Sequence, residues 1–130
     1  MIEVSDERFQ ELIDQALGEL PGEHVKSIQN VAIIYADVPT EEQRVKLELR
    51  NDQTLLGLYE GRPLTQRQGM THVFPDKITL FKWPLASHAN TEDELKEGIK
   101  HTLWHEIAHY YGLDHEQIAA RISHAIIVFK

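Results

Sequence analysis

The sequence has 130 residues and a formal net charge of −8, which is enough chain for one domain with a single hydrophobic core. It contains no cysteine, so disulfides and cysteine-ligated metals are excluded, and a transition-metal site must use histidine and carboxylate ligands. The acidic balance argues against nucleic acid as the favoured partner. We find no signal-peptide pattern and no stretch apolar enough to cross a membrane, so we expect one domain over residues 1–130 in the cytoplasm.

The chain opens with a pattern typical of an amphipathic helix. Ser5 is a good N-cap, and Asp6 and Glu7 place negative charge in the first turn, where the helix dipole favours it. The apolar residues that follow recur at helical spacing, namely Phe9, Leu12, Ile13, Ala16, Leu17 and Leu20. This spacing predicts a helix of about four turns that packs on the core and stops at Leu20-Pro21-Gly22.

Two apolar, β-favouring runs predict strands in the middle of the chain. The run Val31–Tyr35 is typical of a buried strand, and Leu55–Tyr59 reads as a second one. Between them, Thr40 followed by two glutamates predicts a short helix or turn that continues to Leu47.

The segment Lys77–Trp83 predicts a third strand, closed by Pro84. Its lysines and the bordering proline are typical of an edge strand, because such residues discourage uncontrolled strand pairing. An edge strand is also where an extended peptide can pair through its backbone. Edge protection and substrate pairing remain alternative explanations.

Thr91 and Glu94 form a capping-box pattern that predicts a helix of about twenty residues, ending at Gly112. Gly98 and Thr102 lie on one face of this helix, and their small side chains would let another element approach closely.

A last helix is predicted from Asp114, because apolar residues follow it at helical intervals (Ile118, Ile122, Ala125, Ile126 and Phe129). Strands in the middle and helices at both ends indicate an α+β fold. We expect a small mixed sheet packed by the N-terminal helix and the twenty-residue helix, with a C-terminal helix added.

The most informative motif lies near the end of the twenty-residue helix. His105 and His109 are separated by one helical turn, so their imidazoles can reach one metal ion, with Glu106 beside them as the base for a metal-bound water. A turn at Gly112 would let His115 supply a third ligand and leave a fourth position open. This extended spacing predicts a catalytic zinc site.

Three stretches of the sequence resemble the small bacterial zincin-like metallopeptidases. They are Leu55–Gly61, Pro75–Leu80 and His105–Gly112, and the likeness extends over about residues 5 to 118. The resemblance implies a zincin-like fold, a Zn²⁺ cofactor and hydrolysis of peptide or protein substrates, with Glu106 as the general base. The family commonly carries aspartate at the position that matches His115, so Asp114 and Glu116 remain alternative third ligands.

Other polar residues receive weaker predictions. Tyr110, Tyr111 and His101 are candidates for a hydrogen bond to the developing oxyanion or for orienting a ligand, although the tyrosines are more often packing residues. The remaining histidines lack ligand spacing, and we interpret them as surface or packing residues: His24, His72, His88 and His124.

Two other functions stay open. The ending Gly112-Leu113-Asp114-His115 resembles bacterial endoribonucleases of ribosomal RNA maturation, but these lack a glutamate at the position of Glu106. A non-catalytic domain that binds zinc for stability or for docking a partner is the second alternative.

Overall fold

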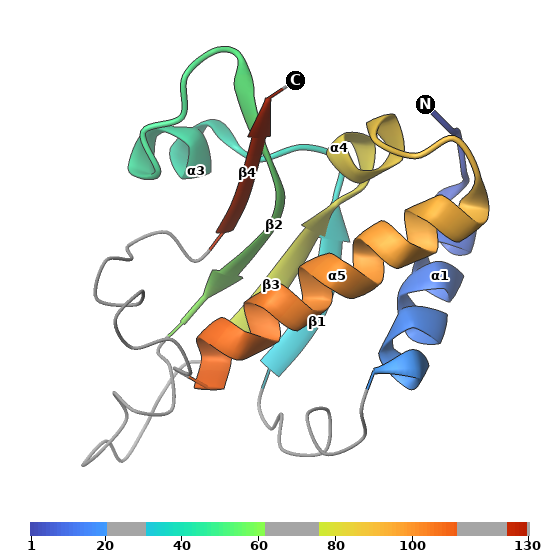
Figure 1. The fold of residues 1–130 in the computed structure, drawn as a ribbon. Coiled ribbons are helices and arrows are strands. Elements are labelled where there is room, and N and C mark those ends of the chain that lie inside the picture. Colours follow the sequence, from blue (N-terminus) through green and yellow to red (C-terminus); the bar gives the residue numbers. More distant parts are fainter. Residues whose placement is uncertain (21–30, 62–75, 112–124, 130) are drawn as a thin grey trace.

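The computed structural model describes residues 1–20, 31–61, 76–111 and 125–129, and within 108–111 and 125–129 it describes the backbone only. The elements in chain order are α1 (Asp6–Glu19), β1 (Val31–Ala36), α3 (Glu41–Lys46), β2 (Gln53–Glu60), β3 (Asp76–Phe81), α4 (Lys82–Ser87), α5 (Glu92–Tyr111) and β4 (Ala125–Phe129) (Figure 1). No helix in the described ranges is long and apolar enough to cross a membrane.

The strands form one mixed sheet in the order β1-β3-β2-β4. β3 pairs in parallel with β1, starting with Asp76 opposite Val31, and antiparallel with β2. β2 also pairs antiparallel with β4. Strands and helices together confirm the predicted α+β class.

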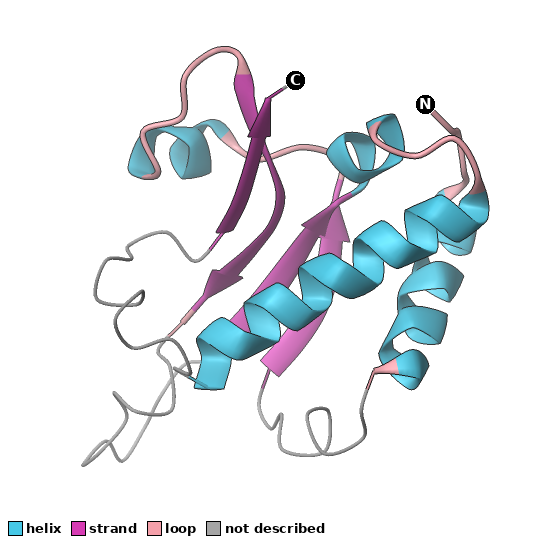
Figure 2. Cartoon of the chain, in the orientation of Figure 1, coloured by secondary structure: helices cyan, strands magenta, loops and turns pink. Residues whose placement is uncertain are grey.

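The main core lies between one face of this sheet and the two long helices. Figure 2 shows α1 and α5 on the same side of the sheet. The buried members of this core from α1 are Phe9, Leu12, Ile13 and Ala16, and those from α5 are Leu95, Ile99, Leu103 and Ile107. The predicted apolar face of the first helix is therefore confirmed.

A smaller apolar cluster covers the other face of the sheet, where Leu55, Leu58 and Phe81 are buried together. Leu55 and Leu58 are three residues apart, which strict strand alternation would put on opposite faces. The pairing of β2 with β4 shifts between Leu55 and Gly57, and such a bulge lets both leucines face the same side.

The predicted helix starts are confirmed by their side-chain caps. Ser5 Oγ accepts from the Arg8 backbone N–H at 3.0 Å, and Thr40 forms a capping box with Gln43. Thr91 Oγ1 accepts from the Glu94 N–H at 3.1 Å. These caps act over three residues, so the local sequence determines them.

The predicted edge strand at Lys77–Trp83 is wrong in two respects. β3 ends at Phe81, and it lies in the interior of the sheet between β1 and β2. Its lysines need no sheet edge, since Lys77 pairs with Glu60 at 3.7 Å and Lys82 pairs with Asp6 at 2.7 Å. An interior strand has no free edge for a substrate peptide, so β3 cannot be the pairing strand suggested by its composition.

Two further predictions need correction. β1 is a strand as predicted, but it lies at the sheet edge and is only partly buried, with Ile34 41% exposed. The predicted C-terminal helix is wrong over Ala125–Phe129, which form β4. That run is continuously apolar and contains three β-branched residues, so it suits a strand that pairs with β2 better than a helix. The start of the predicted helix lies outside the described residues.

Ion pairs join α1 to α5 at the molecular surface. Glu19 accepts from Lys96 at 2.7 Å and from Lys100 at 3.2 Å, and Arg8 pairs with Glu92 at 2.7 Å. The hydrogen bond from Lys96, followed by that from Lys100, holds the pKa of Glu19 below its ordinary value.

Because the folded pKa of Glu19 is below the unfolded value of 4.5, its ion pair stabilises the fold above that pH and is lost as the pH falls through the folded pKa. We expect Glu19→Gln to lower Tm slightly at pH 7 and to have no effect at about pH 3. Thermal unfolding at both pH values, in low and high salt, measures this. Glu3→Gln, at an exposed residue outside any ion pair in the described chain, is the control, and an equal loss in both variants would contradict the expectation.

Candidate active site

Helix α5 carries His105, Glu106 and His109 in its last two turns. Figure 1 shows this half of α5 beside the end of β2 and the start of β3. His105 is half-buried, while the side chain of His109 is outside the described part. His115 lies outside the described residues altogether, as do the alternative ligands Asp114 and Glu116.

Glu106 is completely buried, at 0% exposure. Its Oε1 accepts a hydrogen bond from the Tyr59 backbone N–H at 3.1 Å. Its Oε2 is buried as well and has no hydrogen-bond partner among the described residues. Buried polar atoms normally have hydrogen-bond partners. This oxygen is therefore available to bind a proton or to accept a hydrogen bond from a water molecule.

The spacing of α5 matches that of β2 where the two elements touch. Thr102 packs on Gly57, and one helical turn later Glu106 meets Tyr59. Four residues of helix rise about 6 Å and two residues of strand advance about 6.8 Å. The distance between the two contacts is therefore nearly the same along the helix as along the strand. A Cβ on Gly57 would overlap the Thr102 Cγ2, so the predicted close approach at Thr102 is confirmed.

Gly98, the other small residue on this face, makes a less demanding contact. A Cβ there would lie 3.7 Å from Leu85 Cδ2, which is an ordinary van der Waals distance. The close approach therefore depends on Gly57 and Thr102.

The end of β2 is tied to the start of β3 behind Glu106. The Tyr59 hydroxyl donates to Asp76 Oδ2 at 2.6 Å, and both side chains are buried. Gly61 has φ of +148°, and a Cβ on it would overlap the Asp76 side chain. Glycine is therefore required at this position for two reasons, conformation and space.

Burial raises the pKa of Glu106 well above its ordinary value, and the hydrogen bond from the Tyr59 backbone partly opposes this. Desolvation disfavours the charged form of a carboxyl group, whereas an N–H donor favours it. The group is therefore a stronger base in this site than an exposed glutamate would be.

The residues present fit a zinc ion in part. Two histidines one turn apart on a helix are common zinc ligands. Glu106, which follows His105 in the sequence, has a buried Oε2 with no hydrogen-bond partner among the described residues. Within the described residues no cluster of three candidate ligands occurs. The predicted third ligand, His115, lies outside the described residues.

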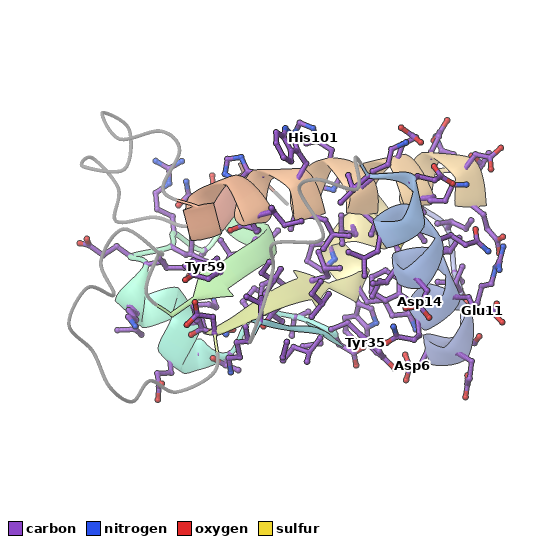
Figure 3. The ribbon with its side chains drawn as sticks, turned by 90° about the horizontal axis from the view of Figure 1, so that it is seen from below. Asp6, Glu11, Asp14, Tyr35, Tyr59 and His101 are labelled. Atoms are coloured by element: carbon purple, nitrogen blue, oxygen red, sulfur yellow. The ribbon has the colours of Figure 1, made fainter. Side chains whose placement is uncertain are left out.

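The other candidate residues for the site are His101, Tyr110 and Tyr111, and the structure describes the side chain of His101. His101 is exposed, and Figure 3 shows it on the side of α5 away from the sheet, whereas Tyr59 lies on the sheet side. His101 and Glu106 are five residues apart, about 140° around the helix axis, so His101 does not face the Glu106 carboxylate. The side chains of Tyr110 and Tyr111 are not among those described.

Among the four histidines without ligand spacing, His88 is described. Its ring Nδ1 lies 2.8 Å from the Pro84 carbonyl oxygen at the end of α4, which agrees with the predicted packing or surface role. His24, His72 and His124 lie outside the described residues.

Sequence reasoning assigned no role at the site to Tyr59 or Asp76, and it did not identify Gly57 as the residue that Thr102 contacts. Tyr59 acts on Glu106 through its backbone N–H, which no side-chain pattern can indicate. The available signal was that Tyr59 and Asp76 both belong to stretches that resemble the metallopeptidase family.

Helix α5 thus carries an H-E-x-x-H motif against a mixed sheet, with the motif glutamate buried and bound to a strand backbone, and this motif is typical of zinc sites. Comparison with protein-family models matches residues 28–124 to the family described as zincin-like metallopeptidase. The match covers most of the chain, and the chain belongs to this family. A search of curated proteins found no matching sequence.

Proposed function

We propose that this protein is a zinc-dependent peptidase in which Glu106 is the general base and His105, His109 and His115 hold the metal. The observation that carries the proposal is the Glu106 carboxylate, buried with one oxygen held by Tyr59 and the other without a partner in the described chain. Family membership supports the reaction class.

A bound zinc ion would supply a Lewis acid that activates water and polarises a peptide carbonyl. Neutral histidine ligands would leave the double positive charge of the ion intact. Zinc is favoured over other metals by the type of motif.

The chain's own residues provide the proton transfers. Glu106 would accept a proton from the attacking water at Oε2 and pass it to the leaving amine. The Tyr59 N–H, bound to Oε1, fixes the orientation of the carboxylate through both transfers. The core packing of α5 prevents the helix from shifting, because Leu103 and Ile107 on either side of Glu106 are fully buried.

The test is hydrolysis of an unfolded protein such as casein, with and without a chelator. We expect chelation to abolish cleavage and added zinc to restore it. We also expect His109→Ala to weaken zinc binding by more than about 100-fold, measured by metal content after dialysis against a competing chelator. His101→Ala, at an exposed histidine on the same helix, is the matched control and should retain zinc and activity.

The same preparations distinguish the two rival functions. Chelator-sensitive degradation of single-stranded RNA with casein left intact would contradict the peptidase proposal in favour of an endoribonuclease. Stoichiometric zinc with no hydrolysis of a broad set of peptides and proteins would contradict it in favour of a non-catalytic zinc domain.

A further inference from the structure

The stretches Leu55–Gly61 and Pro75–Leu80 resemble the metallopeptidase family, yet the H-E-x-x-H chemistry uses neither of them directly. In the structure, one residue of each stretch takes part in a hydrogen bond close to Glu106. The Tyr59 hydroxyl donates to Asp76 Oδ2 at 2.6 Å. Tyr59 is 1% exposed and Asp76 is 2% exposed, so solvent does not compete for this bond.

Asp76 is anchored in the sheet. It is the first residue of β3, it lies opposite Val31 of β1, and the next residue, Lys77, pairs with Glu60 of β2. An aspartate at this point therefore cannot move without disturbing strands on both sides. Its side chain also fills the space beside Gly61, which places it against the last turn of chain that leaves β2.

Tyr59 connects this anchor to Glu106. Its side chain donates to Asp76, and its backbone N–H donates to the Glu106 carboxylate. Tyr59 lies opposite Ile78 in the ladder between β2 and β3. Strand pairing and the Asp76 bond therefore act together to fix the position of the Tyr59 peptide.

Burying a carboxylate and a hydroxyl at a sheet position costs desolvation that an apolar pair would avoid. Core filling therefore does not account for the choice of these two residues. A hydrogen bond with defined direction does, because the position of an N–H donor within a few tenths of an ångström determines how the acceptor carboxylate is oriented.

We propose that Tyr59 and Asp76 are positioning residues that hold the Glu106 carboxylate in its catalytic orientation through the Tyr59 backbone N–H. The inference rests on the proposed function, in which Glu106 is the general base. Neither residue touches the substrate in this scheme.

The test is Tyr59→Phe, which removes one hydroxyl and keeps the ring and the backbone donor. We expect kcat for peptide hydrolysis to fall about tenfold, since small displacements of a reacting group are costly, with KM and zinc content unchanged. Tyr35→Phe is the matched control, because Tyr35 lies on β1 with its ring against Phe9 at a centroid distance of 5.5 Å. A fall in kcat of the same size in both variants, or none in Tyr59→Phe, overturns the inference.

Asp76 is tested by rescue. Asp76→Asn keeps an oxygen acceptor and is expected to retain most of kcat, whereas Asp76→Leu should lose about as much as Tyr59→Phe. Ile13→Val, which removes a methylene group from the main core, shows what lowered stability alone does, and it should leave kcat unchanged. Equal kcat in the Asn and Leu variants would contradict a hydrogen-bonding role for Asp76.

Amide hydrogen exchange of Tyr59 in metal-free protein separates this inference from the proposed function. We expect Tyr59→Phe to speed exchange at residue 59 about tenfold and to leave Leu80 unchanged. If the parent protein hydrolyses nothing, the peptidase proposal fails, while this exchange result still decides whether Tyr59 and Asp76 hold Glu106. Unchanged exchange at residue 59 overturns the inference whatever the activity.

Discussion

Glu106→Gln is expected to lower kcat for peptide hydrolysis by about 10²- to 10⁴-fold, the range over which general acid–base groups contribute. Glutamine has the same shape and can still accept the Tyr59 N–H bond at its amide oxygen, so the local structure should survive. It cannot take a proton from water at neutral pH. The loss therefore reports the missing base, and the zinc content should equal that of the parent protein.

Glu97→Gln is the matched control for this substitution. Glu97 lies on the same helix, its side chain is 63% exposed, and it forms a surface ion pair with Lys100. We expect it to retain full activity. Hydrolysis by Glu106→Gln at more than a tenth of the parental rate, with zinc bound, would rule out Glu106 as the general base.

The expected change in stability of Glu106→Gln also has a defined direction in the metal-free protein. Burial raises the folded pKa of Glu106 above the unfolded value of 4.5. Ionisation of Glu106 therefore reduces the stability of the fold as the pH rises from about 4.5 toward the folded pKa. Glu106→Gln removes this cost, so we expect the metal-free variant to be at least as stable as the metal-free parent at pH 7.

Gly57→Ala is expected to destabilise the fold by about 1–3 kcal/mol, the usual cost of overpacking a tight contact. The added Cβ would overlap Thr102 Cγ2, and Thr102 is fully buried on a helix that the core fixes in place. Relief requires α5 to move away from β2. Because Glu106 follows Thr102 by one turn, hydrolysis should fall together with Tm.

The partner substitution makes this prediction specific. Thr102→Ser removes Cγ2 and keeps the hydroxyl, which donates to the Gly98 carbonyl at 2.8 Å. Alone it should cost about 1 kcal/mol, as for loss of one buried methyl group. Combined with Gly57→Ala it should restore most of the lost stability. Additive losses, measured by denaturant unfolding of all four proteins, would show that the Gly57 contact does not set the distance between helix and strand.

Sheet order and strand position were not predictable from composition. Lys77 and Lys82 suggested an edge strand, but each lysine pairs with an acidic residue from another element. Those partners, Glu60 and Asp6, are distant in the sequence, and no local pattern identifies them. The apolar run at the C-terminus likewise matched helical spacing, and pairing with β2 decided that Ala125–Phe129 form a strand.

The sequence by itself determined the features that act over three or four residues. These are the caps of α1, α3 and α5, the apolar face of α1, and the one-turn spacing of His105 and His109 on a single helix. Such features depend on backbone geometry that is the same in every helix, so they can be predicted before the fold is known.

Only the tertiary structure decided the surroundings of Glu106. The Tyr59 N–H that holds one carboxylate oxygen is 47 residues away in the chain, and it reaches Glu106 because Gly57 lets β2 approach Thr102. The burial that raises the pKa of Glu106 also comes from the packing of distant elements. A backbone donor and a desolvated environment leave no side-chain pattern in the sequence, because they arise only when the sheet and helix α5 pack together.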